Sequence, residues 1–153
     1  MQTYTLHRKQ FMAASIQDIW DFFSDARNLA TITPSYMNFR ITSGLPDSIH
    51  SGQIISYKVS PIAGLPLSWT TEIKDVEPYK RFVDIQLNGP YTLWQHEHRF
   101  EEIESGVQMY DTVTYQLPFS FIGVLAHKLF IKRQLHNIFD YRYQKIEAIF
   151  NRV

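Results

Sequence analysis

Alternation of apolar and polar residues dominates the middle of the chain. Between Phe39 and Gln116, strand-length runs rich in Val, Ile, Thr, Tyr and Phe are separated by turn residues such as Gly, Pro, Asn and Ser. The divisions, one of which spans residues 61–66, predict strands near 39–43, 53–60, 67–76, 81–87, 92–103 and 107–116. A more weakly alternating segment at 2–12 adds a first strand, and together the seven segments predict an antiparallel meander.

Two other segments have a helical period. Ser15 can cap a helix whose apolar residues at positions 16, 19, 20 and 23 recur at the spacing of one helical face. A short second helix at 28–32 is expected to end at Pro34. From Ile122 a helical period continues almost to the C-terminus and predicts one long helix over residues 121–150. At ~1.5 Å per residue this helix would be roughly 45 Å long, enough to cross a seven-stranded sheet.

The order of these elements predicts the fold class. One strand, two short helices, six strands and a long helix keep strands and helices in separate blocks, which is typical of an α+β fold and not of parallel βαβ units. We therefore expect a helix-grip fold, in which a curved antiparallel sheet closes around the C-terminal helix. No repeat or linker divides the chain, so residues 1–153 are expected to form one domain. Such a sheet often leaves an internal space, and internal spaces are favoured ligand sites.

Composition narrows the classes of function. Fifteen Lys and Arg balance fifteen Asp and Glu, and no basic run could follow a phosphate backbone, so nucleic acid is not an expected partner. The absence of cysteine excludes disulfides, thiolate catalysis and Cys-ligated zinc, and it agrees with a cytoplasmic location. The opening segment has no apolar region of the kind a signal peptide needs. The longest mainly apolar run, at 117–126, is about half of the ~20 residues that span a bilayer, so no membrane insertion is expected.

The predicted hairpin at 92–116 carries the strongest candidate chemistry. Because side chains alternate along a strand, one inward face gathers Trp94, His96, His98 and Phe100. If Ser105-Gly106 forms a two-residue turn, the inward face of the second strand gathers Met109, Asp111, Val113 and Tyr115. This register places Phe100 opposite Asp111, His98 opposite Val113 and His96 opposite Tyr115. It also predicts a diagonal pair between His98 and Asp111.

The polar groups on this aromatic face have four interpretations. They need partners, because burying such a group unpaired costs roughly 1–3 kcal/mol. They form a structural network in which they satisfy one another, or they orient the polar head of a ligand whose body the apolar neighbours hold. A metal site of His96, His98 and Asp111 and acid–base catalysis by a His/Asp pair are the other two. No G-x-S-x-G, P-loop or H-E-x-x-H motif supports catalysis, and neither a metal nor a cofactor is predicted.

Three residues outside the hairpin are candidates for the same interior. Tyr57 and Trp69 share strand faces with apolar neighbours, as residues of a core or of a pocket wall do. Arg142 lies at an otherwise apolar phase of the long helix, where it either reaches into the cavity or extends to its rim, and we favour the rim. The predicted ligand-binding residues are Tyr57, Trp69, Trp94, His96, His98, Phe100, Met109, Asp111, Val113, Tyr115 and Arg142.

Two segments resemble a known family. Residues 20–34, and residues 94–100 together with 110–118, are similar to a bacterial branch of the START-like (SRPBCC, pollen-allergen-like) superfamily. Members of this branch are often labelled polyketide cyclase/dehydrase-like or cell-division-inhibitor-like, and the resemblance spans nearly the whole chain. It implies a hydrophobic cavity between sheet and long helix, used by different members for lipids, sterols, polyketides or plant hormones, and in a few for cyclisation or dehydration. No catalytic motif of the family carries over to particular residues of this chain.

We therefore expect the chain to bind a small hydrophobic ligand, such as a lipid, a fatty acyl chain or an aromatic, polyketide-like metabolite. The alternative is a cyclase- or dehydratase-type enzyme, in which His96 or His98, oriented by Asp111, acts as acid and base and Tyr115 donates a hydrogen bond. Binding without catalysis is the favoured interpretation. A protein-interaction or stress-related helper domain without a tight ligand is the third. The sequence predicts neither the identity of the ligand nor the oligomeric state.

Overall fold

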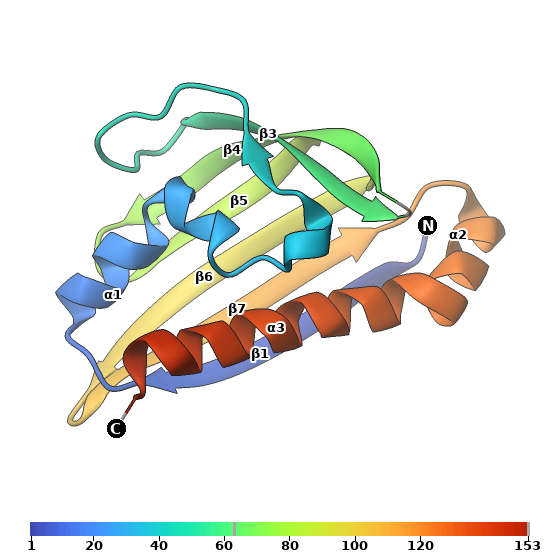
Figure 1. Ribbon diagram of the computed structural model, residues 1–153. Coiled ribbons are helices and arrows are strands. Elements are labelled where there is room, and N and C mark those ends of the chain that lie inside the picture. Colours follow the sequence, from blue (N-terminus) through green and yellow to red (C-terminus); the bar gives the residue numbers. More distant parts are fainter. Residues whose placement is uncertain (63, 153) are drawn as a thin grey trace.

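A computed structural model describes residues 1–62 and 64–152 of the chain. Its seven strands form one antiparallel sheet in the order β1-β7-β6-β5-β4-β3-β2, and the helices cover one face of that sheet (Figure 1). The predicted α+β helix-grip fold is confirmed. The strands are β1 (Thr3–Met12), β2 (Arg40–Ile41), β3 (Ile54–Ile62), β4 (Leu65–Glu77), β5 (Arg81–Asn88), β6 (Leu93–Ile103) and β7 (Gly106–Gln116).

The helix α1 (Ile16–Phe23) begins where the sequence predicts it. The hydroxyl of Ser15 accepts a hydrogen bond from the backbone N–H of Asp18 at 3.1 Å, so a side chain satisfies one of the free N–H groups at the helix start. Two 3₁₀ helices follow, η1 (Ala26–Ala30) and η2 (Ser35–Met37). The sequence predicts only the first, two residues too late, because a turn of three residues is too short to show a period.

The long C-terminal helix includes a π-helical turn. It consists of α2 (Ser120–Ala126), a π-helical turn η3 (His127–Ile131) and α3 (Lys132–Phe150), all joined without a break in the helical backbone. The predicted helix over residues 121–150 is thus confirmed in its extent. A hydrophobic period does not reveal the π-helical turn, whose wider hydrogen bonding only shifts the phase of the residues after it.

The strands β3 and β4 extend farther than the sequence predicts. They reach Ile62 and Leu65, inside the turn expected at residues 61–66, with an irregular register between Val59 and Ile62. Residue 63 of that predicted turn lies outside the described residues. Two prolines bound this segment, and prolines favour a turn in a sequence-based reading although they are tolerated at irregular strand positions.

The hairpin between β6 and β7 turns one residue earlier than predicted. Ile103 pairs with Gly106, so the two-residue turn is Glu104-Ser105 and not Ser105-Gly106. A side chain at position 106 would collide with the backbone oxygen of Met12, which explains why glycine occupies a strand position here.

This turn shifts the β6–β7 register by two residues. Because side chains alternate with a period of two, such a shift leaves every residue on its predicted face. His98 lies directly opposite Asp111. The predicted pairings of Phe100 with Asp111, His98 with Val113 and His96 with Tyr115 are wrong, and the observed partners are Met109, Asp111 and Val113, in that order.

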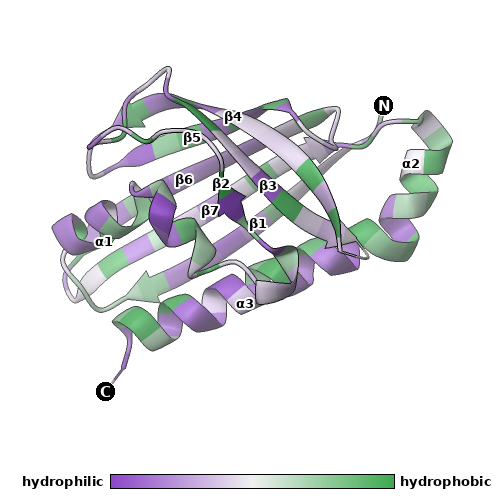
Figure 2. Cartoon of the chain, turned by 45° about the horizontal axis from the view of Figure 1, so that its top comes forward, coloured by the Kyte–Doolittle hydropathy of each residue, from purple (hydrophilic) through white to green (hydrophobic). Residues whose placement is uncertain are grey.

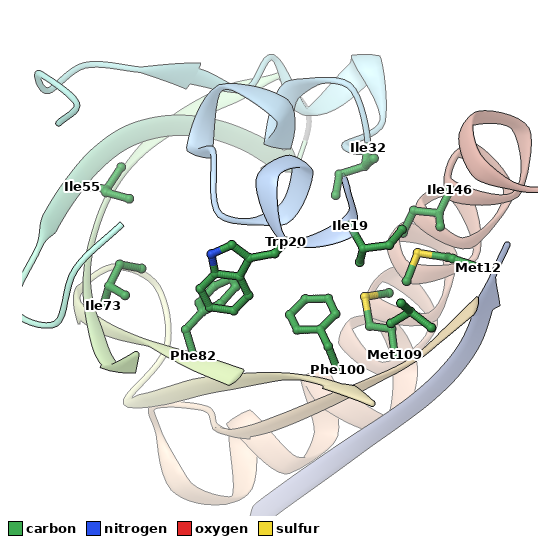
Figure 3. Packing of buried hydrophobic residues seen from close by; sticks show 11 residues of the cluster. Met12, Ile19, Trp20, Ile32, Ile55, Ile73, Phe82, Phe100, Met109 and Ile146 are labelled. Atoms are coloured by element: carbon green, nitrogen blue, oxygen red, sulfur yellow. The ribbon is translucent and has the colours of Figure 1, made fainter. Parts of the chain in front are cut away.

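The buried side chains form two apolar clusters along the sheet, and apolar and polar residues alternate along its strands (Figure 2). The first cluster lies under α1 and contains Met12, Ile19, Trp20, Ile32, Ile55, Ile73, Phe82, Phe100, Val107, Met109 and Ile146 (Figure 3). The second contains Leu6, Met37, Val59, Trp69, Trp94, Val113, Tyr115, Leu135 and Phe139. Side chains of the sheet and of α3 contribute to both clusters.

Candidate functional site

A layer of buried polar side chains lies between the two apolar clusters. On β6 its two histidines lie between Phe100 of the first cluster and Trp94 of the second. The exposed fraction is 4% for His98 and Asp111 and 7% for Arg142, so these groups depend on protein partners rather than on water. This polar layer consists of Asp84 on β5, His96 and His98 on β6, Asp111 on β7 and Arg142 on α3.

Hydrogen bonds and charges connect the polar layer. The Nε2 atom of His96 lies 2.7 Å from Oδ1 of Asp111. The Nε2 atom of His98 lies 2.9 Å from Oδ2 of Asp84. The guanidinium of Arg142 donates from Nη2 to the same Asp111 oxygen at 3.3 Å. Because an ionised carboxylate can only accept, each imidazole donates its Nε2–H.

Both carboxylates of the polar layer are ionised. Burial by itself raises the pKa of Asp111, but the charge of Arg142 and the hydrogen bond from His96 outweigh burial and hold that pKa well below its usual range. Burial likewise raises the pKa of Asp84. The hydrogen bond from His98, together with the charges of His96 and Arg142, outweighs burial, so the pKa of Asp84 is lowered. Each of the two imidazoles in the polar layer is therefore hydrogen-bonded to a negatively charged carboxylate.

His98 is neutral at pH 7. Burial, together with the charge of the neighbouring His96, lowers the pKa of His98 to about 4, although Asp84 acts in the opposite direction. With its proton on Nε2, the ring has a free lone pair on Nδ1. This Nδ1 atom has no hydrogen-bond partner among the described residues and lies 3.5 Å from Oδ1 of Asp111, which is also an acceptor.

The lowered pKa of His98 predicts a loss of stability in mild acid. In the unfolded chain this imidazole returns to a pKa of 6.5, so between pH 6.5 and about 4 the unfolded state binds a proton that the folded state does not. The free energy of unfolding should therefore fall as the pH drops through this window, by roughly 3 kcal/mol. Urea unfolding at neutral pH and near pH 4.5 measures the loss.

Two variants assign this loss to a residue. His98→Gln should reduce it, whereas His50→Gln, at an exposed histidine, should leave it unchanged. An equal acid loss in His98→Gln and in the unmodified protein would contradict the neutral, buried state of His98.

The structure brings the predicted pair of His98 and Asp111 together, with 3.5 Å between Nδ1 and Oδ1, but the two residues lie directly opposite and not diagonally. The hydrogen bonds run instead from His96 to Asp111 and from His98 to Asp84 on the other neighbouring strand. Asp84 was missed, although it alternates with the apolar Phe82 in a predicted strand and so shares its inward face. The register of β5 against β6 depends on the turn geometry at residues 89–92, which the sequence pattern does not fix.

Arg142 and Tyr115 also differ from their predicted positions. Arg142 is buried rather than placed at the rim, and its guanidinium lies 5.4 Å from the ring centre of Phe23. Tyr115 lies outside the polar layer. Its hydroxyl is 2.7 Å from Nε2 of His127 in the π-helical turn η3. The two residues are twelve positions apart and belong to different elements, so no pattern in the sequence indicates that they are partners.

The polar layer offers three candidate metal ligands, but their geometry suits hydrogen bonding better. Ligand atoms of Asp84, His96 and His98 lie within 4.8 Å of one another. The two imidazoles stack, with 3.7 Å between ring centres and 27° between ring planes. A ligating nitrogen directs its lone pair within the ring plane, and rings that are nearly parallel direct their lone pairs side by side instead of toward one ion. Phe82 stacks on His98 at 4.2 Å and helps to hold this arrangement.

A cavity of about 390 Å³ lies between the sheet and the helices. Small-molecule sites in proteins have volumes of about 300–1,000 Å³, so the cavity is large enough for a small ligand. Most of the residues that line it are apolar, among them Phe23 of α1 and Ile122 of α2. The polar layer interrupts this wall, because four of its members line the cavity, Asp84, His96, His98 and Arg142.

Some of the predicted ligand-binding residues line the cavity, and others do not. The predicted residues that line it are Tyr57, Trp69, Trp94, His96, His98 and Arg142. The predicted residues outside its lining are Phe100, Met109, Asp111, Val113 and Tyr115, which pack behind it in the apolar clusters or in the polar layer. Lining residues from α1, η1 and α2 were missed, since a helical period shows which face is buried but not what that face meets.

Comparison with known proteins places the chain in a family. The family described as "Polyketide cyclase / dehydrase and lipid transport" matches residues 12–140. The chain therefore belongs to this family, and the START-like resemblance seen in the sequence is confirmed. No curated protein sequence matches the chain.

Solved structures share the fold at low sequence identity. Protein CV1439 from Chromobacterium violaceum superimposes with a TM-score of 0.74 at 8% identity, covering 97% of this chain and 98% of that one. The Zhui aromatase/cyclase from Streptomyces sp. R1128 has a TM-score of 0.70 at 16% identity, with 95% and 94% covered. Protein Ms6760 from Mycobacterium smegmatis has a TM-score of 0.67 at 15% identity, with 97% and 96% covered. These similarities establish the fold and leave the ligand open.

Proposed function

We propose that this protein binds a small, mainly apolar molecule that carries at least one oxygen. The observation that carries the proposal is an apolar cavity with buried, unpartnered polar atoms on its lining residues. Trp69 Nε1 and Arg142 Nε are donors without an acceptor, and His98 Nδ1 is an acceptor without a donor, among the residues that the structure describes. A ligand carbonyl or carboxylate that reached the two donors, or a hydroxyl that reached any of the three atoms, would relieve a burial cost of roughly 1–3 kcal/mol for each atom it paired.

Lipids, fatty acids and aromatic, polyketide-like metabolites fit this description. Each combines a body that an apolar wall can hold with an oxygen function for the polar layer. The family to which the chain belongs is described by polyketide cyclisation and lipid transport, which supports the same range of ligands. We place this binding in the cytoplasm, on the basis of the cysteine-free composition.

A filled cavity should abolish binding. Ile138 on α3 lines the cavity and is half-buried, so Ile138→Trp should occupy the space without disturbing the sheet. Ile149 lies on the same helix outside the lining, and Ile149→Trp is the matched control. A C12 fatty acid or a hydroxynaphthalene should raise the melting temperature of the unmodified protein and of Ile149→Trp, and leave Ile138→Trp unchanged.

Two results would contradict the proposal. One is that neither probe, nor a wider set of lipids and aromatic compounds, shifts the melting temperature of the unmodified protein. The other is that Ile138→Trp remains folded and keeps the full shift, because the ligand would then bind outside this cavity.

A cyclase- or dehydratase-type reaction is the second candidate function. One observation favours it, since the Asp84 carboxylate orients Nε2 of His98 while Nδ1 has no hydrogen-bond partner among the described residues, a pairing found in many acid–base sites. A pKa of about 4, however, makes this imidazole a weak base at neutral pH, and for this reason we place binding first. If a polyketide-like substrate is converted, His96→Gln or His98→Gln should abolish turnover while ligand binding persists.

A further inference from the structure

A short segment at one end of the molecule exposes many large apolar side chains. Phe121 and Leu129 are 77% and 71% exposed. Single exposed apolar residues are ordinary, but a contiguous group of this size marks an interaction surface. We name this group the α2 surface, and its members are Phe119, Phe121, Ile122, Val124, Leu125, Leu129 and Phe130.

The charged residues of the segment that carries the α2 surface are all basic. Residues 112–139 contain three basic side chains, Lys128, Lys132 and Arg133, and no Asp or Glu. All three are exposed, and Lys128 stands next to Leu129 in the apolar group. In a chain whose formal net charge is zero, this segment is therefore a local basic region. An exposed apolar group with a basic margin is complementary to the surface of an anionic bilayer.

The α2 surface is continuous with the cavity. Phe119 and Ile122 are largely exposed, and both also line the cavity. The helix α2 lies at the end of the molecule, beyond the sheet, in both overall views (Figures 1 and 2). The apolar group and the cavity wall therefore share two residues at this end of the molecule.

The backbone holds the α2 surface in its outward position. Phe119 and Ser120 both have left-handed backbone angles, with φ of 68° and 43°, which residues other than glycine rarely adopt. Gly123 packs closely on Pro118, and a side chain at position 123 would collide with the backbone oxygen of Pro118. A strained turn followed by a close helix contact fixes the direction of α2, so the exposure of its apolar residues is a built feature of the fold.

We propose that the α2 surface docks the protein onto an anionic lipid bilayer. Phe121 and Leu129 enter the boundary between head groups and acyl chains, while Lys128 and Lys132 contact the anionic head groups. The acid-free basic margin favours lipid over a second apolar protein surface, which would need no such charge. Because the inference concerns the outer surface, it can fail while ligand binding in the cavity stands.

Vesicle co-sedimentation tests the docking. The protein should bind vesicles with about one third phosphatidylglycerol at least tenfold more tightly than vesicles of phosphatidylcholine alone, and added salt should weaken the binding. The double variant Phe121→Asp with Leu129→Asp should lose the binding and keep its melting temperature, because both side chains are exposed. The double variant Lys128→Glu with Lys132→Glu should weaken binding about tenfold or more, to the anionic vesicles only.

Matched controls exclude general effects of charge. Ile103→Asp adds a charge at an exposed apolar residue of the β6–β7 hairpin, and Lys80→Glu with Lys145→Glu reverses two exposed charges elsewhere. Both controls should bind like the unmodified protein. Absence of vesicle binding, equal binding to both kinds of vesicle, or equal losses in the controls would overturn the proposal. So would a dimer in solution that Phe121→Asp with Leu129→Asp converts to a monomer, since the surface would then join two copies of this chain.

Discussion

Replacing Asp111 with asparagine is expected to lower the free energy of unfolding by about 3–5 kcal/mol. The carboxylate of Asp111 accepts hydrogen bonds from His96 and from the guanidinium of Arg142, all within the buried polar layer. Asparagine keeps the size of the side chain but removes the negative charge, so the positive charge of Arg142 stays buried without compensation. Urea unfolding at neutral pH measures the difference.

An exposed ion pair between β1 and α3 supplies the control for this prediction. Asp140 pairs with Arg8 at 2.6 Å, and its side chain is 57% exposed. Asp140→Asn should cost no more than about 1 kcal/mol, since exposed ion pairs contribute little. If Asp111→Asn cost no more than Asp140→Asn, the polar layer would not be the charge-balanced network described above.

Replacing Trp94 with alanine is expected to cost about 3–5 kcal/mol, the range for truncating a buried Trp or Phe. Trp94 is 9% exposed and belongs to the second apolar cluster, where its ring meets Trp69 edge-on at 5.4 Å. The substitution removes a large apolar ring and enlarges the cavity that this ring borders. The shift of the urea midpoint, compared with Tyr36→Ala at an exposed aromatic residue, measures the cost. An unchanged midpoint would contradict the inward packing of β6.

The fold was predictable because its elements are long and their patterns agree. Strand periods of two and helical periods of 3.6 gave the order of elements, and that order selects an α+β sheet with segregated helices. The faces of β6 and β7 were also predictable, because alternation from Trp94 to Phe100 and from Met109 to Tyr115 is strong. A register error of two residues left these faces correct.

The site was predictable only in part. The inward histidines and Asp111 follow from alternation within one hairpin, but hydrogen-bond partners depend on registers between strands. Asp84 therefore joined the site only when β5 was placed beside β6, and Asp111 proved to bind His96 instead of His98. The depth of Arg142 depends on how closely α3 packs on the sheet, which no pattern along the helix specifies.

A buried layer of charged side chains contributes little to the stability of a protein core. Replacing a buried ion pair by apolar residues of similar volume is often neutral or stabilising, so stability alone gives little reason for charged groups at this position. Their place on the wall of an apolar cavity agrees with a recognition role. Trp69, His98 and Arg142 line the cavity, and each has one buried polar atom without a partner among the described residues. A ligand hydroxyl, which can both donate and accept, is the complement of that set.

Native mass spectrometry of the protein purified from cells, repeated after addition of a C12 fatty acid or a hydroxynaphthalene, tests the binding function most directly. We expect a one-to-one complex with a small apolar molecule, either retained from the cell or formed on addition. Ile138→Trp should carry none, while Ile149→Trp should bind like the unmodified protein. A spectrum showing only the mass of the free chain, before and after addition of either probe, would contradict the claim that this cavity binds a ligand.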